Sequence, residues 1–248
     1  MNMKRVLFVF ASVVILSSCE KAPVKPQNIR FSILGDSFSA FQGYVEPATN
    51  DVWYCPPPNN YIDVTSVEQM WWHQVATKTG WALDVNNSFS GSLISNFWGF
   101  NTGLYFSPHS FIRRMDNLGN PDVILVFGAT NDIYKRAALG DYVFANWTEE
   151  ELCMFRPAMA YMFDYLKRNY PTAEVYFMLD MELCINDTSI DDATRQAYIE
   201  SVHYITSHYD VGCIDIYGIR KDAWHPNVAG QEAIARQLID AIEVDFNV

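Results

Sequence analysis

The feature that most constrains the fold of this chain is an alternation of short apolar runs with longer segments of helical periodicity. The run at residues 122–128, DVILVFG, is apolar almost throughout, which is typical of a strand covered on both faces. We predict strands at 29–34, 82–88, 122–128, 174–179 and 213–217, and helices at 66–80, 149–170, 189–209 and 228–244. This order predicts a single doubly wound α/β domain with a five-stranded parallel sheet.

Composition agrees with one sizeable domain and excludes two classes of protein. Of the 248 residues, 50% are hydrophobic and 15% are aromatic, so a large core can form and global disorder is excluded. The formal net charge is -12, and no cluster of Lys or Arg follows residue 30. A surface of this charge repels phosphate backbones, so we expect no nucleic-acid partner.

The N-terminus predicts an export signal. Lys4 and Arg5 precede an apolar run, Val6 to Leu16, that is too short for a permanent membrane helix. The run ends in Leu-Ser-Ser-Cys, which resembles the lipobox of bacterial lipoproteins, where cleavage precedes a cysteine that is then acylated. A plain secretory peptide with an incidental cysteine is the alternative reading, but Cys19 falls where the apolar run ends, after two small residues.

These signals divide the chain into three parts. Residues 1–18 are predicted to be a lipoprotein signal peptide, and 19–28 a lipidated cysteine followed by a proline-containing tether. Residues 29–248 are predicted to form the folded domain. The predicted location is the cell envelope, with the protein attached to a membrane through lipid on Cys19.

Polar motifs follow the predicted strands. Ser37 lies in Gly-Asp-Ser after the first strand, Gly91 follows the second, and Asn131 follows the third in Gly-Ala-Thr-Asn-Asp. Asp222-Ala-Trp-His225 lies between the last strand and the last helix. Because the carboxyl ends of parallel strands meet at one edge of the sheet, we expect these residues to share a cleft. A Gly-Asp-Ser alone is also an ordinary turn sequence, so the other motifs decide its meaning.

The residue types fit nucleophilic catalysis. A serine hydroxyl is a weak nucleophile until a base removes its proton, and His225 is the candidate base for Ser37. Asp222, three residues earlier, is placed to fold back and fix the histidine tautomer. The oxyanion of a tetrahedral intermediate needs donors, and the backbone N–H groups of Ser37 and Gly91 and the amide of Asn131 are candidates. The sequence has no zinc-type His/Glu cluster and no phosphate loop, so we predict neither metal nor cofactor.

Together, the four motifs resemble those of the SGNH (GDSL-type) hydrolase family over nearly the whole chain after the tether. The resemblance implies a flavodoxin-like sheet, Ser37 as nucleophile, Gly91 and Asn131 as oxyanion donors, and esterase, lipase, thioesterase or carbohydrate-deacetylase chemistry. One position departs from the family pattern: the third motif is usually Gly-x-Asn-Asp, and here Ala129 stands two positions before Asn131. We expect the loop to keep its shape with a slight backbone adjustment.

Several other features leave alternatives open. Trp53 and Tyr54, in the long proline-rich segment 44–61, are either a substrate wall or a structural lid, and segment 95–106 raises the same question. Asp36 and Asp132 are expected to hold loops through hydrogen bonds to nearby backbone. The remaining histidines are expected to be structural or solvated: His73, His109, His203 and His208. Four cysteines could pair or stay as thiols: Cys55, Cys153, Cys184 and Cys213.

The sequence thus predicts an exported, lipid-anchored serine esterase that works through a covalent acyl-enzyme. The first expectation for its substrate is a carbohydrate ester such as an O-acetylated glycan, and a lipase or thioesterase of the same fold is the alternative enzyme. A catalytically inactive glycan-binding surface lipoprotein is the alternative from another class. The intact serine, histidine, aspartate and asparagine favour the enzyme, because a binding module has no chemical need for all four.

Overall fold

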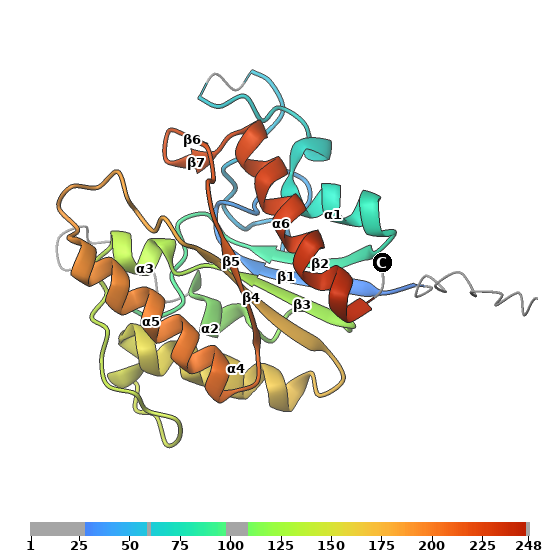
Figure 1. The fold of residues 1–248 in the computed structure, drawn as a ribbon. Helices are drawn as coiled ribbons and strands as arrows, with labels where there is room; N and C mark the ends of the chain where they lie inside the picture. The colour runs from blue at the N-terminus through green and yellow to red at the C-terminus, as the bar shows by residue number, and fades with distance from the viewer. Residues whose placement is uncertain (1–27, 59–60, 98–108, 247–248) are drawn as a thin grey trace, which may run out of the picture.

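The sheet is fully parallel and has the strand order β2-β1-β3-β4-β5 (Figure 1). A computed structural model describes residues 28–58, 61–97 and 109–246. The strands are β1 (Arg30–Gly35), β2 (Ala82–Ser88), β3 (Val123–Phe127), β4 (Glu174–Asp180) and β5 (Gly212–Ile216). The strand order reverses between β1 and β3, which is the position where doubly wound sheets open a crevice. The predicted five-stranded α/β domain is therefore confirmed.

Helices cover both faces of the sheet (Figure 1). Helices α1 (Trp71–Thr79) and α6 (Val228–Phe246) pack on one face. The opposite face is covered by α2 (Phe111–Arg114), α4 (Phe155–Asn169) and α5 (Asp192–His208). A short helix α3 (Thr130–Tyr134) follows β3, and 3-10 turns η1 (Val67–Gln69) and η3 (Glu151–Cys153) precede α1 and α4.

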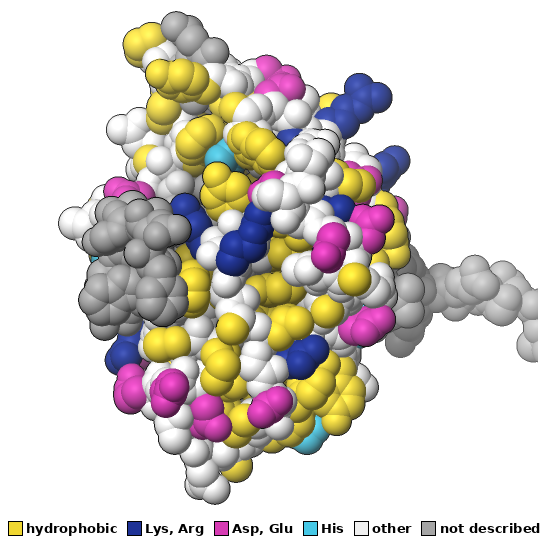
Figure 2. Space-filling model, turned by 90° about the vertical axis from the view of Figure 1, so that its left-hand side faces the viewer, with side chains coloured by type: hydrophobic (Ala, Val, Ile, Leu, Met, Phe, Trp, Pro, Cys, Tyr) yellow, Lys and Arg dark blue, Asp and Glu magenta, His cyan; other side chains and the backbone are white. Residues whose placement is uncertain are grey.

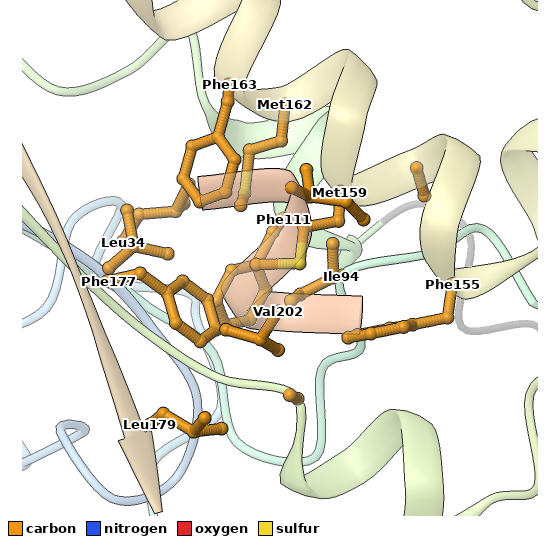
Figure 3. Packing of buried hydrophobic residues seen from close by; sticks show 14 of the residues in the cluster. Leu34, Ile94, Phe111, Phe155, Met159, Met162, Phe163, Phe177, Leu179 and Val202 are labelled. Carbon is orange, nitrogen blue, oxygen red and sulfur yellow. The ribbon is translucent and has the colours of Figure 1, made fainter. Parts of the chain in front are cut away.

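Two hydrophobic clusters form the core, one on each side of the sheet. Side chains of a strand alternate between its faces, so Leu125 of β3 packs toward α1 and α6 while Val126 packs toward α2, α4 and α5. Figure 3 shows the second cluster, in which Phe163 of α4 lies close to Leu34 of β1 and Phe177 of β4. Covering on both faces explains why the β3 sequence is apolar without interruption.

Most helix ends are where the capping residues predict them. Gly80 adopts a left-handed conformation (φ 79°) and ends α1. The side chain of Asn227 accepts the N–H of Gly230 at 3.0 Å in the first turn of α6. The predicted helix 149–170 is divided at Met154, whose backbone is extended. Pro157 lies in the first turn of α4, where its missing N–H removes no intrahelical bond.

Cys55, Cys153, Cys184 and Cys213 are all free thiols. Among the residues that the structure describes, no helix combines the length and the apolar character needed to cross a membrane. The predicted signal peptide and Cys19 lie outside the described residues, as does most of segment 95–106.

Candidate active site

A cavity of about 270 Å³ opens at the carboxyl ends of the strands and brings three predicted site residues together. Ser37, Asn131 and His225 line it, and Gly91 does not. The other lining residues are mostly apolar or aromatic: Phe38, Trp53, Thr130, Tyr134, Cys184, Ile185, Asn186, Lys221, Ala223 and Trp224. Figure 2 looks onto this end of the sheet and shows hydrophobic side chains gathered around a histidine.

Ser37 and His225 form the contact that nucleophile activation requires. The Nε2 atom of His225 lies 2.9 Å from the Oγ atom of Ser37. The indole ring of Trp53 stacks on the imidazole, with ring centroids 3.7 Å apart and planes 9° apart. The pKa of His225 is lowered to about 4, mainly by burial and to a smaller extent by the nearby charge of Lys221, while the hydrogen bond to the Ala223 carbonyl opposes this shift. The imidazole is therefore neutral at neutral pH and able to accept a proton.

A two-residue hairpin presents His225. Strands β6 (Lys221–Asp222) and β7 (His225–Pro226) are antiparallel, with Asp222 opposite His225. The two central residues, Ala223 and Trp224, have φ values of 46° and 70°. Positive φ at both positions is typical of a type I′ turn, which normally uses Asn and Gly. Because Ala-Trp carries no such signal, the sequence did not predict this hairpin.

The position of Asp222 differs from the prediction. The Nδ1 atom of His225 lies 2.9 Å from the backbone carbonyl oxygen of Ala223, while the Asp222 carboxylate accepts a hydrogen bond from Asn227 Nδ2 at 3.1 Å. The positive φ angles of the turn bring the Ala223 carbonyl to the ring, and Asn227 holds the carboxylate of Asp222. A carbonyl can only accept, so this contact assigns the Nδ1-protonated tautomer and leaves the Nε2 lone pair facing Ser37.

Asn131 also lines the cavity and lies in the first turn of α3. Its Nδ2 atom donates to the Oδ2 atom of Asp36 at 3.1 Å, which leaves the second amide hydrogen for another acceptor. Ala129, just before the helix, has φ 76°. Glycine adopts this left-handed conformation without strain, which explains why the family motif usually has glycine at this position. Alanine adopts it at a cost of roughly 1–2 kcal/mol. The loop thus keeps a glycine-like conformation rather than adjusting away from it.

The loop that carries Gly91 is fixed to the same region. Asp132 of α3 accepts the backbone N–H groups of Ile94 at 2.8 Å and Ser95 at 3.1 Å, as predicted for a loop-holding carboxylate. Gly91 itself has φ 76°. Within the described parts of the chain, the N–H groups of Ser37 and Gly91 donate to no other group. Both remain available as donors, although Gly91 lies outside the cavity lining.

The role of the buried Arg114 was not predicted from the sequence. Its guanidinium donates to the backbone carbonyls of Gly35 at 3.1 Å, His109 at 2.8 Å and Asn87, and also to the Ser92 hydroxyl at 3.0 Å. These bonds join the end of β1, the end of β2 and the Gly91 loop. Burial lowers the pKa of Arg114 to about 9, which still leaves it charged at neutral pH. A single arginine next to apolar residues has no pattern that predicts such a role.

Two further findings concern the wall of the cavity. Lys221 forms an ion pair with the buried Asp180 and lies over the Phe38 ring, 5.5 Å from its centroid. The sequence did not indicate this pair. Trp53 is part of the wall, whereas the Tyr54 hydroxyl is buried and donates to the Pro226 carbonyl at 2.8 Å. Tyr54 therefore has a structural role, while contact of Trp53 with a substrate stays a prediction.

Comparison with known proteins identifies the family of this chain. The family model of GDSL-like lipases and acylhydrolases matches residues 29–242. A protein assigned to the GDSL-like lipases from Bacteroides ovatus ATCC 8483 is 42% identical, with 88% of this chain and 100% of that chain covered and a TM-score of 0.79. A second such protein, from Bacteroides uniformis ATCC 8492, is 37% identical, with 88% and 96% covered and a TM-score of 0.78.

A family two carbohydrate esterase from Clostridium thermocellum, solved in complex with cellohexaose, shares the fold at 14% identity. Its TM-score is 0.57, with 92% of this chain and 67% of that chain covered. A search of curated proteins finds no match.

Proposed function

Since the chain belongs to the GDSL-like lipase and acylhydrolase family and is a serine hydrolase that acts on esters, we propose that it removes acyl groups from a carbohydrate through an acyl-enzyme on Ser37. The observation that carries this proposal is the 2.9 Å contact between Ser37 Oγ and His225 Nε2 inside the cavity. A serine and a neutral histidine at this distance form the minimal unit for acyl transfer.

The reaction would proceed in two halves. The Ser37 oxygen attacks the ester carbonyl carbon while His225 Nε2 takes the hydroxyl proton, and the oxyanion that forms accepts hydrogen bonds from the Ser37 and Gly91 N–H groups and the Asn131 amide. The C–O bond to the alcohol then breaks, and His225 returns the proton to the departing oxygen. Water attacks the acyl-enzyme by the same steps in reverse, releasing the acid and restoring the Ser37 hydroxyl.

In this mechanism the carbonyl of Ala223 takes the orienting position predicted for Asp222. It holds the Nδ1–H of His225 at 2.9 Å and accepts a stronger hydrogen bond when the ring becomes positive. The base is therefore oriented by a backbone carbonyl in place of a carboxylate. Asp222 accepts a hydrogen bond from Asn227 and so contributes to the shape of the hairpin.

The mouth of the cavity supports a carbohydrate as the alcohol part. Trp224 and Tyr134 line it with 55% and 47% of their surfaces exposed, and such aromatic faces suit sugar rings. The carbohydrate esterase from Clostridium thermocellum, which shares the fold and was solved in complex with cellohexaose, is consistent with this proposal.

A substrate panel tests this proposal. Acetylated sugars would be compared with aryl esters of acyl chains from two to twelve carbons, using Ser37→Ala as the blank. We expect the highest kcat/KM for acetylated sugars and a fall of several orders of magnitude in Ser37→Ala. A steady rise of kcat/KM with chain length would instead identify a lipase, and equal turnover in Ser37→Ala would exclude the mechanism.

We also propose that the protein is an envelope lipoprotein anchored through Cys19. The lipobox-like Leu-Ser-Ser-Cys after the apolar run supports this location. Metabolic labelling with a fatty-acid analogue is expected to mark the wild-type protein and to leave Cys19→Ala unlabelled. Equal label in both would exclude Cys19 as the anchor.

A further inference from the structure

We propose that His203, Cys213 and Asp215 form a binding site for a zinc ion, outside the catalytic cleft. Cys213 and Asp215 are two residues apart on β5, at the edge of the sheet, so their side chains share one face. His203 comes from α5, which packs against β5. None of the three lines the cavity around Ser37.

The distances fit a small rearrangement on binding. His203 Nε2 lies 2.8 Å and Cys213 Sγ 3.9 Å from the same Asp215 oxygen, and all three ligand atoms lie within 4.8 Å of one another. Ligand atoms on a tetrahedral zinc are about 3.3 to 3.6 Å apart, given the usual Zn–S, Zn–N and Zn–O lengths. The His203 and Asp215 side chains are 41% and 30% exposed, so an ion can enter and water can complete the coordination.

The chemistry of the three groups favours zinc over a simple ion pair. A surface pair of His203 and Asp215 needs no thiol beside it, and such a pair contributes only about 0–1 kcal/mol. Thiolate, carboxylate and neutral imidazole together carry two negative charges, which match Zn²⁺. Because the thiol must lose its proton to bind the ion, binding must strengthen as pH rises.

Cobalt and zinc titrations of the full chain with reduced thiols test this site. We expect Co²⁺ to produce a near-ultraviolet sulfur-to-cobalt charge-transfer band that Zn²⁺ removes. Cys213→Ser should abolish the band, and Cys153→Ser, at a half-buried thiol bonded to the Glu149 carbonyl, should keep it. Zinc at 100 times its Kd should raise the Tm by roughly 5 to 11 °C, reversibly with a chelator.

His203→Gln provides a second variant, at a half-exposed position, and its Tm without zinc shows whether it folds. It should lose the Tm increase caused by zinc. A cobalt complex without the charge-transfer band, or an equal Tm increase in wild type, His203→Gln and Cys213→Ser, would overturn the proposal.

An independent observation concerns the cleft: we infer that Asp36 is the positioning residue that orients Asn131, an inference that rests on the proposed ester hydrolysis. The Asp36 carboxylate is buried, and its Oδ1 accepts the Phe38 N–H at 2.9 Å while its Oδ2 accepts Asn131 Nδ2 at 3.1 Å. A flipped amide would put its oxygen against this carboxylate and be repelled. Asp36 thus fixes the orientation of the Asn131 amide at the wall of the cavity that Ser37 also lines, and its role exceeds the loop-holding one that the sequence suggested.

The charge of Asp36 gives this role a pH dependence. Burial raises its pKa to about 7, which the hydrogen bond from Phe38 and the charge of Arg114 oppose, and which the charges of Asp132 and Asp180 reinforce. A protonated Asp36 can donate to the Asn131 oxygen and favour the flipped amide. The pH profile of kcat should therefore lose activity below about pH 7, above the range set by His225.

The same shift predicts an unusual effect on stability. The pKa of Asp36 is about 7 in the folded protein and about 3.9 in the unfolded chain, so the folded state binds the proton more tightly. Asp36 therefore stabilises the fold at low pH, and this stabilisation is lost as pH rises toward 7. Asp36→Asn should therefore leave the Tm at pH 8 unchanged or higher. Its kcat should nevertheless fall by at least about 10-fold, toward the roughly 100- to 1000-fold loss expected for removing one oxyanion donor.

A double-mutant cycle with Asn131→Ala is the decisive test. Because Asp36 acts through Asn131, the double variant should lose no more activity than Asn131→Ala alone. The control is Asp132→Asn, whose native carboxylate bonds to Ile94 and Ser95 and not to Asn131, so its effect should add. If the wild-type protein is active and the losses caused by Asp36→Asn and Asn131→Ala add in the double variant, the inference about Asp36 is overturned. Full activity of Ser37→Ala would instead overturn the proposed function itself.

Discussion

The nucleophile and the base lie on two parts of the molecule that are built in different ways. The loop after β1 carries Ser37 and is buried, and Arg114, Asp36 and Asn131 occupy its polar groups with hydrogen bonds. The β6–β7 hairpin lies at the surface and carries the half-buried His225 next to a turn whose two central residues both have positive φ. One side of the cleft is held by buried hydrogen bonds, and the other by a strained turn and a ring stack.

This difference matches the different roles of the two sides in catalysis: one side stabilises the oxyanion and the other transfers protons. The oxyanion position must be fixed within a fraction of an ångström, because donors act only at the place where charge develops. The base must turn a little to deliver its proton first to the alcohol and then back to Ser37, which a hairpin at the surface permits. We therefore expect loss of the Arg114 hydrogen bonds on the buried side to lower stability, and loss of the ring stack against the hairpin to change the protonation of His225.

The largest effect on stability is expected for Arg114→Met. The variant removes the charged donor of hydrogen bonds to the carbonyls of Gly35, His109 and Asn87, and a hydrogen bond to a charged group contributes about 1.5–3 kcal/mol. The Gly35 carbonyl keeps a hydrogen bond from the Phe89 N–H at 3.1 Å. The free energy of unfolding should fall by about 3 kcal/mol or more, which lowers the Tm by roughly 6–12 °C.

The matched control is the neighbouring Arg113→Met. Arg113 is exposed and forms a 3.2 Å ion pair with Glu149, which is itself largely exposed, so the Tm should barely change. Equal Tm values for the two variants would contradict the role assigned to Arg114.

Trp53→Ala should change protonation on the hairpin side. Removing the stacked indole exposes the imidazole, and less burial raises the pKa of His225 from about 4 toward its ordinary value of about 6.5. An NMR titration of the His225 ring measures this directly. The global Tm should fall less than in Arg114→Met, and an unchanged His225 titration would show that Trp53 does not shield the base.

Ala129→Gly should stabilise the buried side. The positive φ of Ala129 costs roughly 1–2 kcal/mol that glycine avoids, although glycine also gains entropy in the unfolded chain. We expect a net Tm increase of a few degrees, measured by calorimetry, with kcat close to wild type. A lower Tm would mean that the alanine methyl group contributes more packing than its conformation costs.

The smallest effect is expected for Asp222→Ala. In a serine hydrolase whose aspartate orients the base, losing that carboxylate costs about 10⁴-fold in kcat. Here the Ala223 carbonyl holds His225, so we expect a loss below about 10-fold, mainly from the lost bond to Asn227. A loss near 10⁴-fold would restore Asp222 to the orienting role that the sequence predicts.

The comparison also shows what the sequence could predict. Strand-end motifs and apolar periodicity gave the sheet, the helices and the meeting of Ser37, Asn131 and His225, because these depend on local pattern and on one topological rule. The hairpin and the hydrogen-bond network of Arg114 depend on tertiary contacts. Nothing in Ala223-Trp224 signals positive φ, and spacing alone could not tell whether Asp222 or the Ala223 carbonyl would reach the histidine.

The most direct test of the account is labelling by a fluorophosphonate probe, read by mass spectrometry of the intact protein and its peptides. The account predicts one probe per chain, on Ser37, with no labelling in Ser37→Ala and much slower labelling when His225 is replaced by alanine. Because Asp222→Ala keeps the Ala223 carbonyl, it should label at nearly the wild-type rate. A probe found on another residue, or an unlabelled wild-type protein that still hydrolyses esters, would contradict the assignment of Ser37 and His225.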